Sequence, residues 1–249
     1  MATLDRTMLA GKVRVAVHAK SLWPKELPQL SAEQERIRDD FMRYWHEVLP
    51  NRYSVIERFN HGYAARSRLS GAKTLEIGAG LGEHLAFEPD HDENYWAVEL
   101  RGEMAEIIKR TYPRVQTVVG DCQQRLPLED ASFDRALAIH VLEHLPDLPS
   151  AVAELRRVLK AEGRLVAVIP CEGGLAYGLA RRISAQRIFE RRYNVSYDWF
   201  IKSEHLNTPR EIIAELTEHF TILERRYFPL RLPIVTANLV IGLTMQPRS

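Results

Sequence analysis

Residues 74–82 read Thr-Leu-Glu-Ile-Gly-Ala-Gly-Leu-Gly, and this stretch constrains the fold more than any other part of the 249-residue chain. Residues 74–77 are typical of the end of a buried parallel strand. Gly78, Gly80 and Gly82 then remove every second side chain, so backbone N–H groups can approach a ligand closely. A helix expected after this loop directs its positive end toward the same place. The pattern therefore predicts an α/β fold with a nucleotide-like ligand at the carboxyl end of this strand.

The acid at position 76 narrows the class of ligand. Glu76 precedes the first glycine by two residues, which gives E-x-G-x-G-x-G in place of the G-x-G-x-x-G typical of dinucleotide-binding proteins. A carboxylate there would repel a diphosphate and would suit a cationic ammonium or sulfonium ligand. The stretch resembles motif I of the class I S-adenosylmethionine-dependent methyltransferases; a glycine-rich turn of another α/β fold is the alternative. The resemblance implies that Gly78, Ala79, Gly80 and Gly82 pass under the amino-acid part and ribose of S-adenosylmethionine.

A second acid stands where the next strand is expected to end. Residues 95–99 are typical of a strand, and an acid at its tip can accept hydrogen bonds from both hydroxyls of a ribose. The resemblance assigns this role to Glu99, followed by Leu100 as a further cofactor contact. The alternative is a solvated glutamate at a strand end.

A third acid follows the strand expected over residues 115–119. The resemblance implies that Asp121 binds the adenine amino group and that the backbone N–H of Cys122 faces the adenine ring. We expect Cys122 to be a small packing residue, because nothing near it in the sequence would activate its thiol as a nucleophile.

Residues 140–145, His-Val-Leu-Glu-His-Leu, follow a fourth expected strand. They resemble the branch of small-molecule methyltransferases that includes the quinone and sterol enzymes. In that fold the fourth strand ends beside the reacting methyl group, so the resemblance makes His140, Glu143 and His144 candidate catalytic residues, with His140 also contacting the cofactor. Methyl transfer from a sulfonium requires alignment and, for a hydroxyl acceptor, removal of a proton. Histidine suits that task near neutral pH.

A metal is the alternative explanation of the same residues. Some quinone-pathway O-methyltransferases carry E-x-x-E-H at these positions and bind a divalent cation, which would lower the pKa of a catechol hydroxyl. Here His140-x-x-Glu143-His144 matches two of the three positions. The same residues fit a glutamate paired near the next helix and a structural histidine. The sequence therefore predicts no metal, and a metal-assisted catechol or quinone O-methyltransferase is the alternative.

Strands and helices are expected to alternate along the chain, and the last two strands are expected over residues 220–227 and 237–245. The prediction is a Rossmann-like, seven-stranded, mainly parallel sheet with an antiparallel last strand, helices on both faces and an N-terminal helical cap. The expected divisions are an arm (1–30) with a short strand over 12–17, a helical cap (31–69), and a methyltransferase domain (70–249) with a substrate-lid insertion (170–208).

The insertion and the cap are expected to close the site. Residues 178–193 are typical of a helix and hold five arginines and one glutamate. This helix is interpreted either as a solvated face or as a basic, partly apolar lid for an anionic substrate or a membrane surface. His205, also on the insertion, is a second candidate base. Tyr53, Asn60 and Tyr63 of the cap are candidate ligand contacts.

Composition limits the partners. A formal net charge of +1 gives no general attraction to nucleic acid. Two cysteines exclude a disulfide framework and indicate a reducing compartment. No apolar run is long enough to span a membrane and no signal peptide is evident, so we expect a cytoplasmic protein. The expected function is methyl transfer from S-adenosylmethionine to oxygen or nitrogen of a small molecule, with lipid-linked, sugar and secondary-metabolite acceptors considered. A non-catalytic cofactor-binding partner protein is the competing class, and a homodimer stays open.

Overall fold

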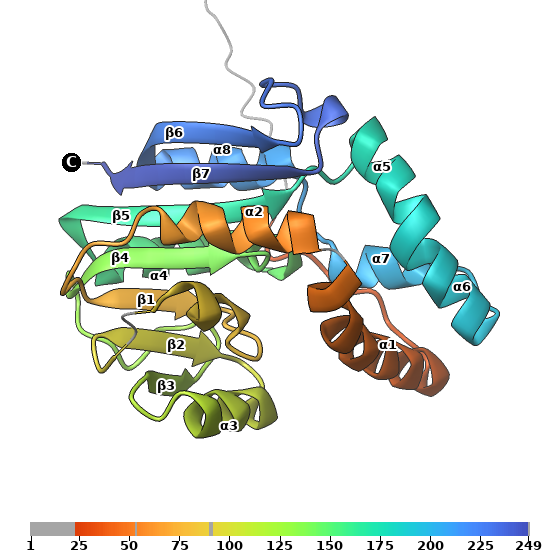
Figure 1. Ribbon diagram of the computed structural model, residues 1–249, viewed down its shortest axis with the longest axis horizontal. Helices are drawn as coiled ribbons and strands as arrows, with labels where there is room; N and C mark the ends of the chain where they lie inside the picture. Colours follow the sequence, from red (N-terminus) through yellow and green to blue (C-terminus); the bar gives the residue numbers. More distant parts are fainter. Residues whose placement is uncertain (1–22, 53, 90–91, 249) are drawn as a thin grey trace, which may run out of the picture.

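The computed structural model describes residues 23–52, 54–89 and 92–248 (Figure 1). The strand predicted over residues 12–17, most of the predicted arm and the candidate contact Tyr53 lie outside the described residues.

The core of the molecule is one seven-stranded sheet with the strand order β3-β2-β1-β4-β5-β7-β6. The five strands from β3 to β5 are parallel, and β7 is antiparallel to both β5 and β6. This confirms the predicted Rossmann-like sheet with its antiparallel last strand. The strands are β1 (Thr74–Ile77), β2 (Tyr95–Glu99), β3 (Gln116–Val119), β4 (Phe133–Ile139), β5 (Leu159–Pro170), β6 (Phe220–Phe228) and β7 (Val240–Pro247).

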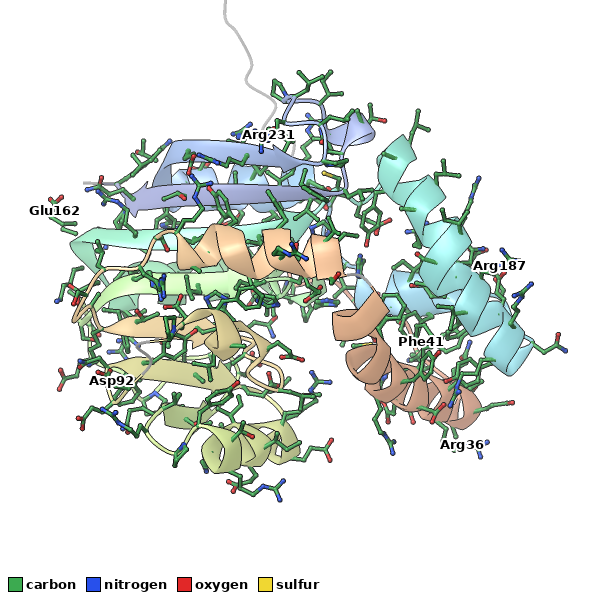
Figure 2. All side chains as sticks on the ribbon, in the orientation of Figure 1. Arg36, Phe41, Asp92, Glu162, Arg187 and Arg231 are labelled. Atoms are coloured by element: carbon green, nitrogen blue, oxygen red, sulfur yellow. The ribbon has the colours of Figure 1, made fainter. Side chains whose placement is uncertain are left out.

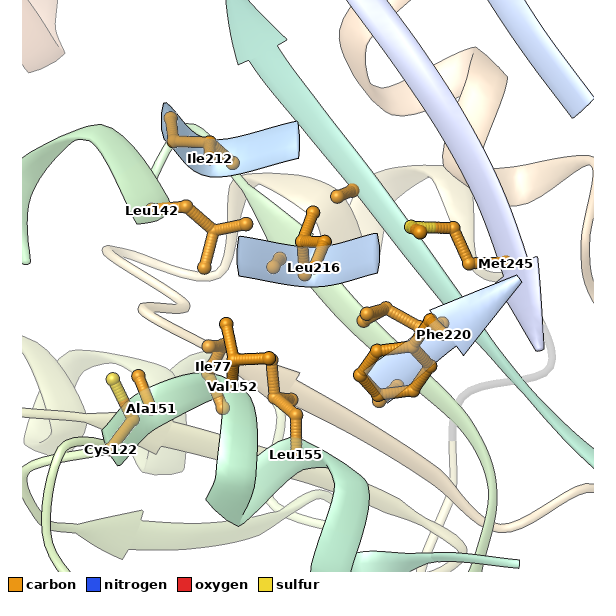
Figure 3. Close-up of a cluster of buried hydrophobic side chains, with 14 of the residues drawn as sticks. Ile77, Cys122, Leu142, Ala151, Val152, Leu155, Ile212, Leu216, Phe220 and Met245 are labelled. Carbon is orange, nitrogen blue, oxygen red and sulfur yellow. The ribbon is translucent and has the colours of Figure 1, made fainter. Parts of the chain in front are cut away.

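Helices cover both faces of the sheet. On one face, α4 (Leu148–Val158) and α8 (Pro209–His219) pack together over β5 and β6. Their apolar side chains form a cluster with the sheet that includes Val152, Leu216 and Phe220, all fully buried (Figure 3). On the other face lie α2 (Ser54–Ala65) and α3 (Gly102–Thr111), with the short helix η1 (Glu83–Phe87) between the glycine loop and β2. These two apolar layers fix the sheet and the positions of its strand ends.

The predicted helical cap divides into two parts in the structure. Helix α2 lies across β4, β5 and β7, and Tyr63 holds it there through a hydrogen bond of 2.8 Å between its hydroxyl and that of Thr244. A Cβ at Gly242 would lie 2.6 Å from the Tyr63 ring, so glycine makes room for this contact. Tyr63 thus packs against the sheet, and Asn60 is buried beside Glu57.

Helix α1 (Ala32–Arg52) packs instead against the insertion, beyond the carboxyl ends of the parallel strands (Figure 1). Phe41 is buried among aromatic rings of the insertion, with its ring 5.0 Å from that of Phe189 and 5.2 Å from that of Phe200 (Figure 2). The insertion consists of α5 (Leu175–Arg181), a π-helical turn η3 (Arg182–Gln186), α6 (Arg187–Tyr193) and α7 (Asp198–Glu204). The predicted lid and α1 therefore share an aromatic core that is separate from the core of the sheet.

Candidate active site

The glycine loop after β1 has a backbone that only glycine adopts easily. Gly78, Gly80 and Gly82 have φ angles of 64°, 58° and 84°, in the left-handed region. A Cβ at Gly78 would lie 2.5 Å from Cγ2 of Val141, in the segment that follows β4. The glycine loop and the His-Val-Leu-Glu-His-Leu segment are therefore in direct contact.

Glu99 ties the glycine loop to the tip of β2. Its buried carboxylate accepts hydrogen bonds from the N–H of Gly80 (3.0 Å), the N–H of Arg101 (3.1 Å) and Nε of Arg101 (3.2 Å). The Arg101 side chain is 44% exposed, so a ligand hydroxyl can replace its contact at little cost. Leu100 follows with its side chain exposed at the rim.

Asp121 and Cys122 stand after β3, the neighbouring strand. Asp121 Oδ1 accepts hydrogen bonds from the backbone N–H (2.9 Å) and Nε2 (3.0 Å) of Gln123, which shapes the turn. The Cys122 side chain is buried in the apolar cluster below α4, and burial raises the pKa of its thiol to about 12. Cys122 therefore carries no thiolate near neutral pH, as expected for a packing residue.

Glu76 is a buried acid on the α2 side of the sheet. Its carboxyl group accepts a hydrogen bond of 2.7 Å from the hydroxyl of Tyr95 on the adjacent strand. Burial raises the pKa of Glu76 to about 8, although the Tyr95 hydrogen bond opposes this shift. The group is therefore mainly protonated at pH 7, so the negative charge closest to the glycine loop is that of other carboxylates.

Sequence reasoning missed one of these carboxylates. Glu83, in the first turn of η1, accepts a hydrogen bond of 2.9 Å from the N–H of Leu81, and its carboxylate lies beside Gly80. The signal for it was available: an acid one residue after the last glycine, at the start of a helix, where the N–H groups are unpaired.

A buried polar chain on the same face was also missed. Arg135 pairs with Glu88 (2.9 Å), and Glu88 contacts His84 (2.9 Å). The rings of His84 and His61 then meet at 3.3 Å between their Nδ1 atoms, and His61 Nε2 reaches Glu57 at 3.1 Å. The four contacts join β4, η1 and α2. The pairs His61–Glu57 and His84–Glu88 have the local i,i+4 spacing, whereas no local pattern predicts the contacts of Arg135 with Glu88 or of His61 with His84.

His140 and Glu143 form a pair at the end of β4. His140 has a φ angle of 49°, an uncommon conformation that reorients the chain as the strand ends. Its Nδ1 lies 3.1 Å from Oε1 of Glu143, which is completely buried in η2 (Leu142–His144). Burial opposes ionisation of Glu143, but the hydrogen bond and charge of His140 outweigh it and lower the pKa to about 2. Burial likewise disfavours the charged His140, yet Glu143 raises the pKa of the imidazole overall.

His144 and His205 meet next to this pair. Their rings lie edge to face with centroids 5.1 Å apart, although the residues are on η2 and at the end of α7. His144 Nδ1 donates to the carbonyl oxygen of Glu204 at 2.6 Å, and burial lowers the pKa of His144 to about 4. His205 Nδ1 lies 3.0 Å from Oε2 of Glu172, which also pairs with Arg181. The structure thus brings the four predicted catalytic candidates together.

Backbone contacts hold the insertion on η2. The N–H groups of Leu206 (2.8 Å) and Asn207 (3.0 Å) both donate to the carbonyl of Glu143. The buried Asn207 side chain donates to the carbonyls of Leu142 (2.8 Å) and Leu145 (2.7 Å). Asn207 was missed by the sequence analysis, because its partners lie more than sixty positions away.

Two cavities flank the insertion and α2. One, of about 700 Å³, runs between α2 and β6 and is lined by Phe59, Phe228 and several arginines. The other, of about 610 Å³, lies between α8 and the β6–β7 loop and has Glu172 in its wall. Glu172 in the wall of the second cavity is the hydrogen-bond partner of His205, and the first cavity includes Phe228 at the carboxyl end of β6.

Comparison with known proteins gives the family. Residues 75–167 match the model of the methyltransferase domain family. The chain is 33% identical over 140 residues to an uncharacterized 37.1 kDa protein in transposon Tn4556 of Streptomyces fradiae, covering 50% of this chain and 40% of that protein. It is 33% identical over 98 residues to a sterol 4-C-methyltransferase of Caenorhabditis elegans, covering 37% of this chain and 29% of that protein. The chain thus spans less than half the length of either relative.

Solved structures share the fold at low identity. The PH0226 protein of Pyrococcus horikoshii superposes with a TM-score of 0.61 at 15% identity, covering 83% of this chain and 99% of that one. The 1,6-didemethyltoxoflavin-N1-methyltransferase of Burkholderia thailandensis, solved with bound 1,6-didemethyltoxoflavin and S-adenosylhomocysteine, has a TM-score of 0.57 at 18% identity, covering 91% of this chain and 94% of that one. The sheet order and these neighbours define a Rossmann-like fold. With the domain match, residues 75–167 form a methyltransferase domain of the class I S-adenosylmethionine-dependent type.

Within the described part of the chain, the helices are all too short or too polar to cross a bilayer.

Proposed function

We propose that the protein transfers a methyl group from S-adenosylmethionine to an oxygen or nitrogen atom of a small molecule. The observation that carries the proposal is the contact between Gly78 and Val141. This contact brings the cofactor loop against the segment that bears His140, Glu143 and His144. A binding loop and proton-accepting groups thus meet at one edge of the sheet, where ligands bind in such folds.

The residues present fit the cofactor. A Cβ at Gly78 would collide with the Val141 side chain and one at Gly80 with the Glu83 carboxylate, so the glycines let the loop backbone lie close to both. Glu99 offers the ribose a buried carboxylate whose exposed Arg101 contact can be exchanged. Asp121 and the N–H of Cys122 are assigned to the adenine, with Leu100 against the ring. The cofactor supplies a methyl group activated by a sulfonium.

The side chains of η2 supply the acid–base chemistry. With Nδ1 of His140 engaged by Glu143, Nε2 is the nitrogen that takes a proton from the acceptor hydroxyl. The ionised Glu143 stabilises the imidazolium that forms and orients the ring. Asn207 holds η2 and the insertion together, which keeps these groups aligned.

The surface of the insertion favours a lipid-linked, anionic acceptor. Leu175, Leu179 and Ile183 are 81%, 62% and 66% exposed and recur every fourth residue, so they share one face of α5 and η3. Exposed arginines follow them along the same helical segment, and Arg187 points away from the molecule in Figure 2. An apolar stripe beside arginines suits an amphipathic acceptor at an anionic lipid surface.

Calorimetric titration tests the cofactor directly. We expect S-adenosylmethionine and S-adenosylhomocysteine to bind the purified protein, and Glu99→Ala to weaken both by roughly 10-fold or more, as for a lost charged hydrogen bond. Glu99→Gln preserves the shape and guards against misfolding, and Glu103→Ala, an exposed acid on α3, is the matched control. Absence of binding to the wild-type protein would contradict the proposal and favour a non-catalytic partner protein.

A further inference from the structure

Three side chains at the junction of η2 and the insertion have the chemistry of a metal site. Glu143, His144 and His205 each place one potential ligand atom within 4.8 Å of the others. A tetrahedral ion with bonds of about 2.1 Å needs its ligand atoms about 3.4 Å apart. Side-chain rotations that move these atoms by about 1 Å would therefore complete the geometry. His144 Nε2 already lies 3.9 Å from Oε1 of Glu143.

The hydrogen bonds of both histidines leave the correct nitrogen free. The carbonyl oxygen of Glu204 only accepts, so Nδ1 of His144 carries the proton and Nε2 keeps its lone pair. The Glu172 carboxylate fixes His205 in the same way, and Arg181 in turn holds Glu172. A carboxylate or carbonyl behind each imidazole is the arrangement that orients histidine ligands in metal sites.

Glu143 supplies an independent observation. Its side chain is completely buried, and Oε2 has no hydrogen-bond partner among the described residues. A buried carboxylate oxygen without a partner is costly, since it has lost its water without replacement. A cation bound by this carboxylate at the junction of Glu143, His144 and His205 would give it the missing partner.

We propose that Glu143, His144 and His205 bind one divalent transition-metal ion of the zinc type, with an open position toward the acceptor. The sequence alone led us to expect no metal, because the same residues also fit a glutamate paired near the next helix and a structural histidine. In the structure His140 pairs with Glu143, and the third ligand comes from the insertion. Two imidazoles and one carboxylate favour zinc over magnesium, which prefers oxygen ligands alone.

The role of the ion, unlike its binding, rests on the proposed methyl transfer. An ion held by Glu143, His144 and His205 would lower the pKa of an acceptor hydroxyl bound to it. The hydroxyl proton passes to Nε2 of His140, and an oxygen electron pair forms the new bond to the methyl carbon. The carbon–sulfur bond breaks with its pair on sulfur, which leaves a neutral thioether and an ether product.

Metal binding can be measured without any acceptor. Protein stripped with EDTA and dialysed is titrated with Co²⁺, whose visible spectrum reports four-coordinate geometry, and with Zn²⁺ against a chelating dye. His205→Gln removes one of the proposed ligands. Glu172→Gln removes the carboxylate that accepts the hydrogen bond from His205. His219→Gln, at the end of α8, is the control. Binding of S-adenosylmethionine to the stripped protein is measured in parallel.

We expect one ion per chain, a loss of at least 10-fold in affinity for Glu172→Gln and a larger loss for His205→Gln, with His219→Gln unchanged. No saturable binding, or equal affinity in all variants, would overturn the metal site. If S-adenosylmethionine still binds in that case, the proposed function survives the loss of this inference. Metal binding without cofactor binding would instead refute the proposed function and retain the site.

Discussion

Replacing Glu76 by glutamine removes a buried acid whose titration should weaken the fold as the pH rises. Burial raises the pKa of Glu76 from 4.5 to about 8 in the folded protein. Between these values the folded protein holds a proton that the unfolded chain has released, so the free energy of unfolding falls with increasing pH. Stability from this group is complete below pH 4.5 and is lost progressively until the pH passes about 8.

The magnitude follows from the shift. One pKa unit corresponds to about 1.4 kcal/mol, so the whole window is worth roughly 5 kcal/mol. Between pH 6 and pH 9 the wild-type protein should lose roughly 2.5 kcal/mol through Glu76 alone. Glu76→Gln cannot ionise and can still accept the Tyr95 hydrogen bond, so this part of the pH dependence should vanish.

Urea unfolding at a series of pH values, followed by circular dichroism, measures the effect as a difference between variant and wild type. The difference cancels the titration of other groups, including the two buried thiols. Glu129→Gln, an exposed acid, is the control and should follow the wild type. Parallel pH profiles of Glu76→Gln and the wild type would refute the claim that this carboxyl is buried and protonated at neutral pH.

Two further predictions concern the insertion. Asn207→Ala leaves two buried carbonyls without their donor, so it should lower the free energy of unfolding by roughly 2–4 kcal/mol. The control Gln124→Ala, at an exposed position, should leave it unchanged, and urea denaturation measures both variants. Vesicles containing phosphatidylglycerol should bind the protein in a flotation assay, and the double variant Leu179→Ser/Ile183→Ser should bind severalfold more weakly. The control is Leu223→Ser on β6. Equal binding by the double variant and this control would exclude the exposed stripe of the insertion as a lipid contact.

The sheet could be predicted from the sequence because its signals are local. Apolar runs end in acids or glycines, and each of these marks a strand end within a few residues. The capping box at Thr208 and Glu211 forms as the sequence indicates, with proline at the first helical position. The last strand begins at Val240 and not at the predicted residue 237. Asn238 bonds the carbonyls of Leu232 and Ile234 and holds the preceding loop in a short turn.

The contacts of the site could be predicted only in part. Motif residues fix which strand ends carry Glu99, Asp121 and His140, because the order of strands in this fold follows from the resemblance. Nothing in the sequence pairs His144 with the Glu204 carbonyl or His205 with Glu172, since these contacts depend on how the insertion folds back. The burial of the Glu76 side chain could likewise not be predicted from the sequence, because an acid at a strand end usually has access to water.

The anchoring of the insertion separates the position of His205 from the exposed surface of α5 and α6. The hydrogen bonds from Leu206 and Asn207 to η2 involve main-chain groups and one buried amide. They place His205 beside His144 without using the exposed residues of α5 and α6. Substitutions along the exposed stripe that includes Leu179 therefore change what the insertion contacts, while the position of His205 is kept. The proposed acceptor contact of the stripe and the proposed role of His205 thus depend on separate parts of one segment, so mutation can alter the first without moving His205.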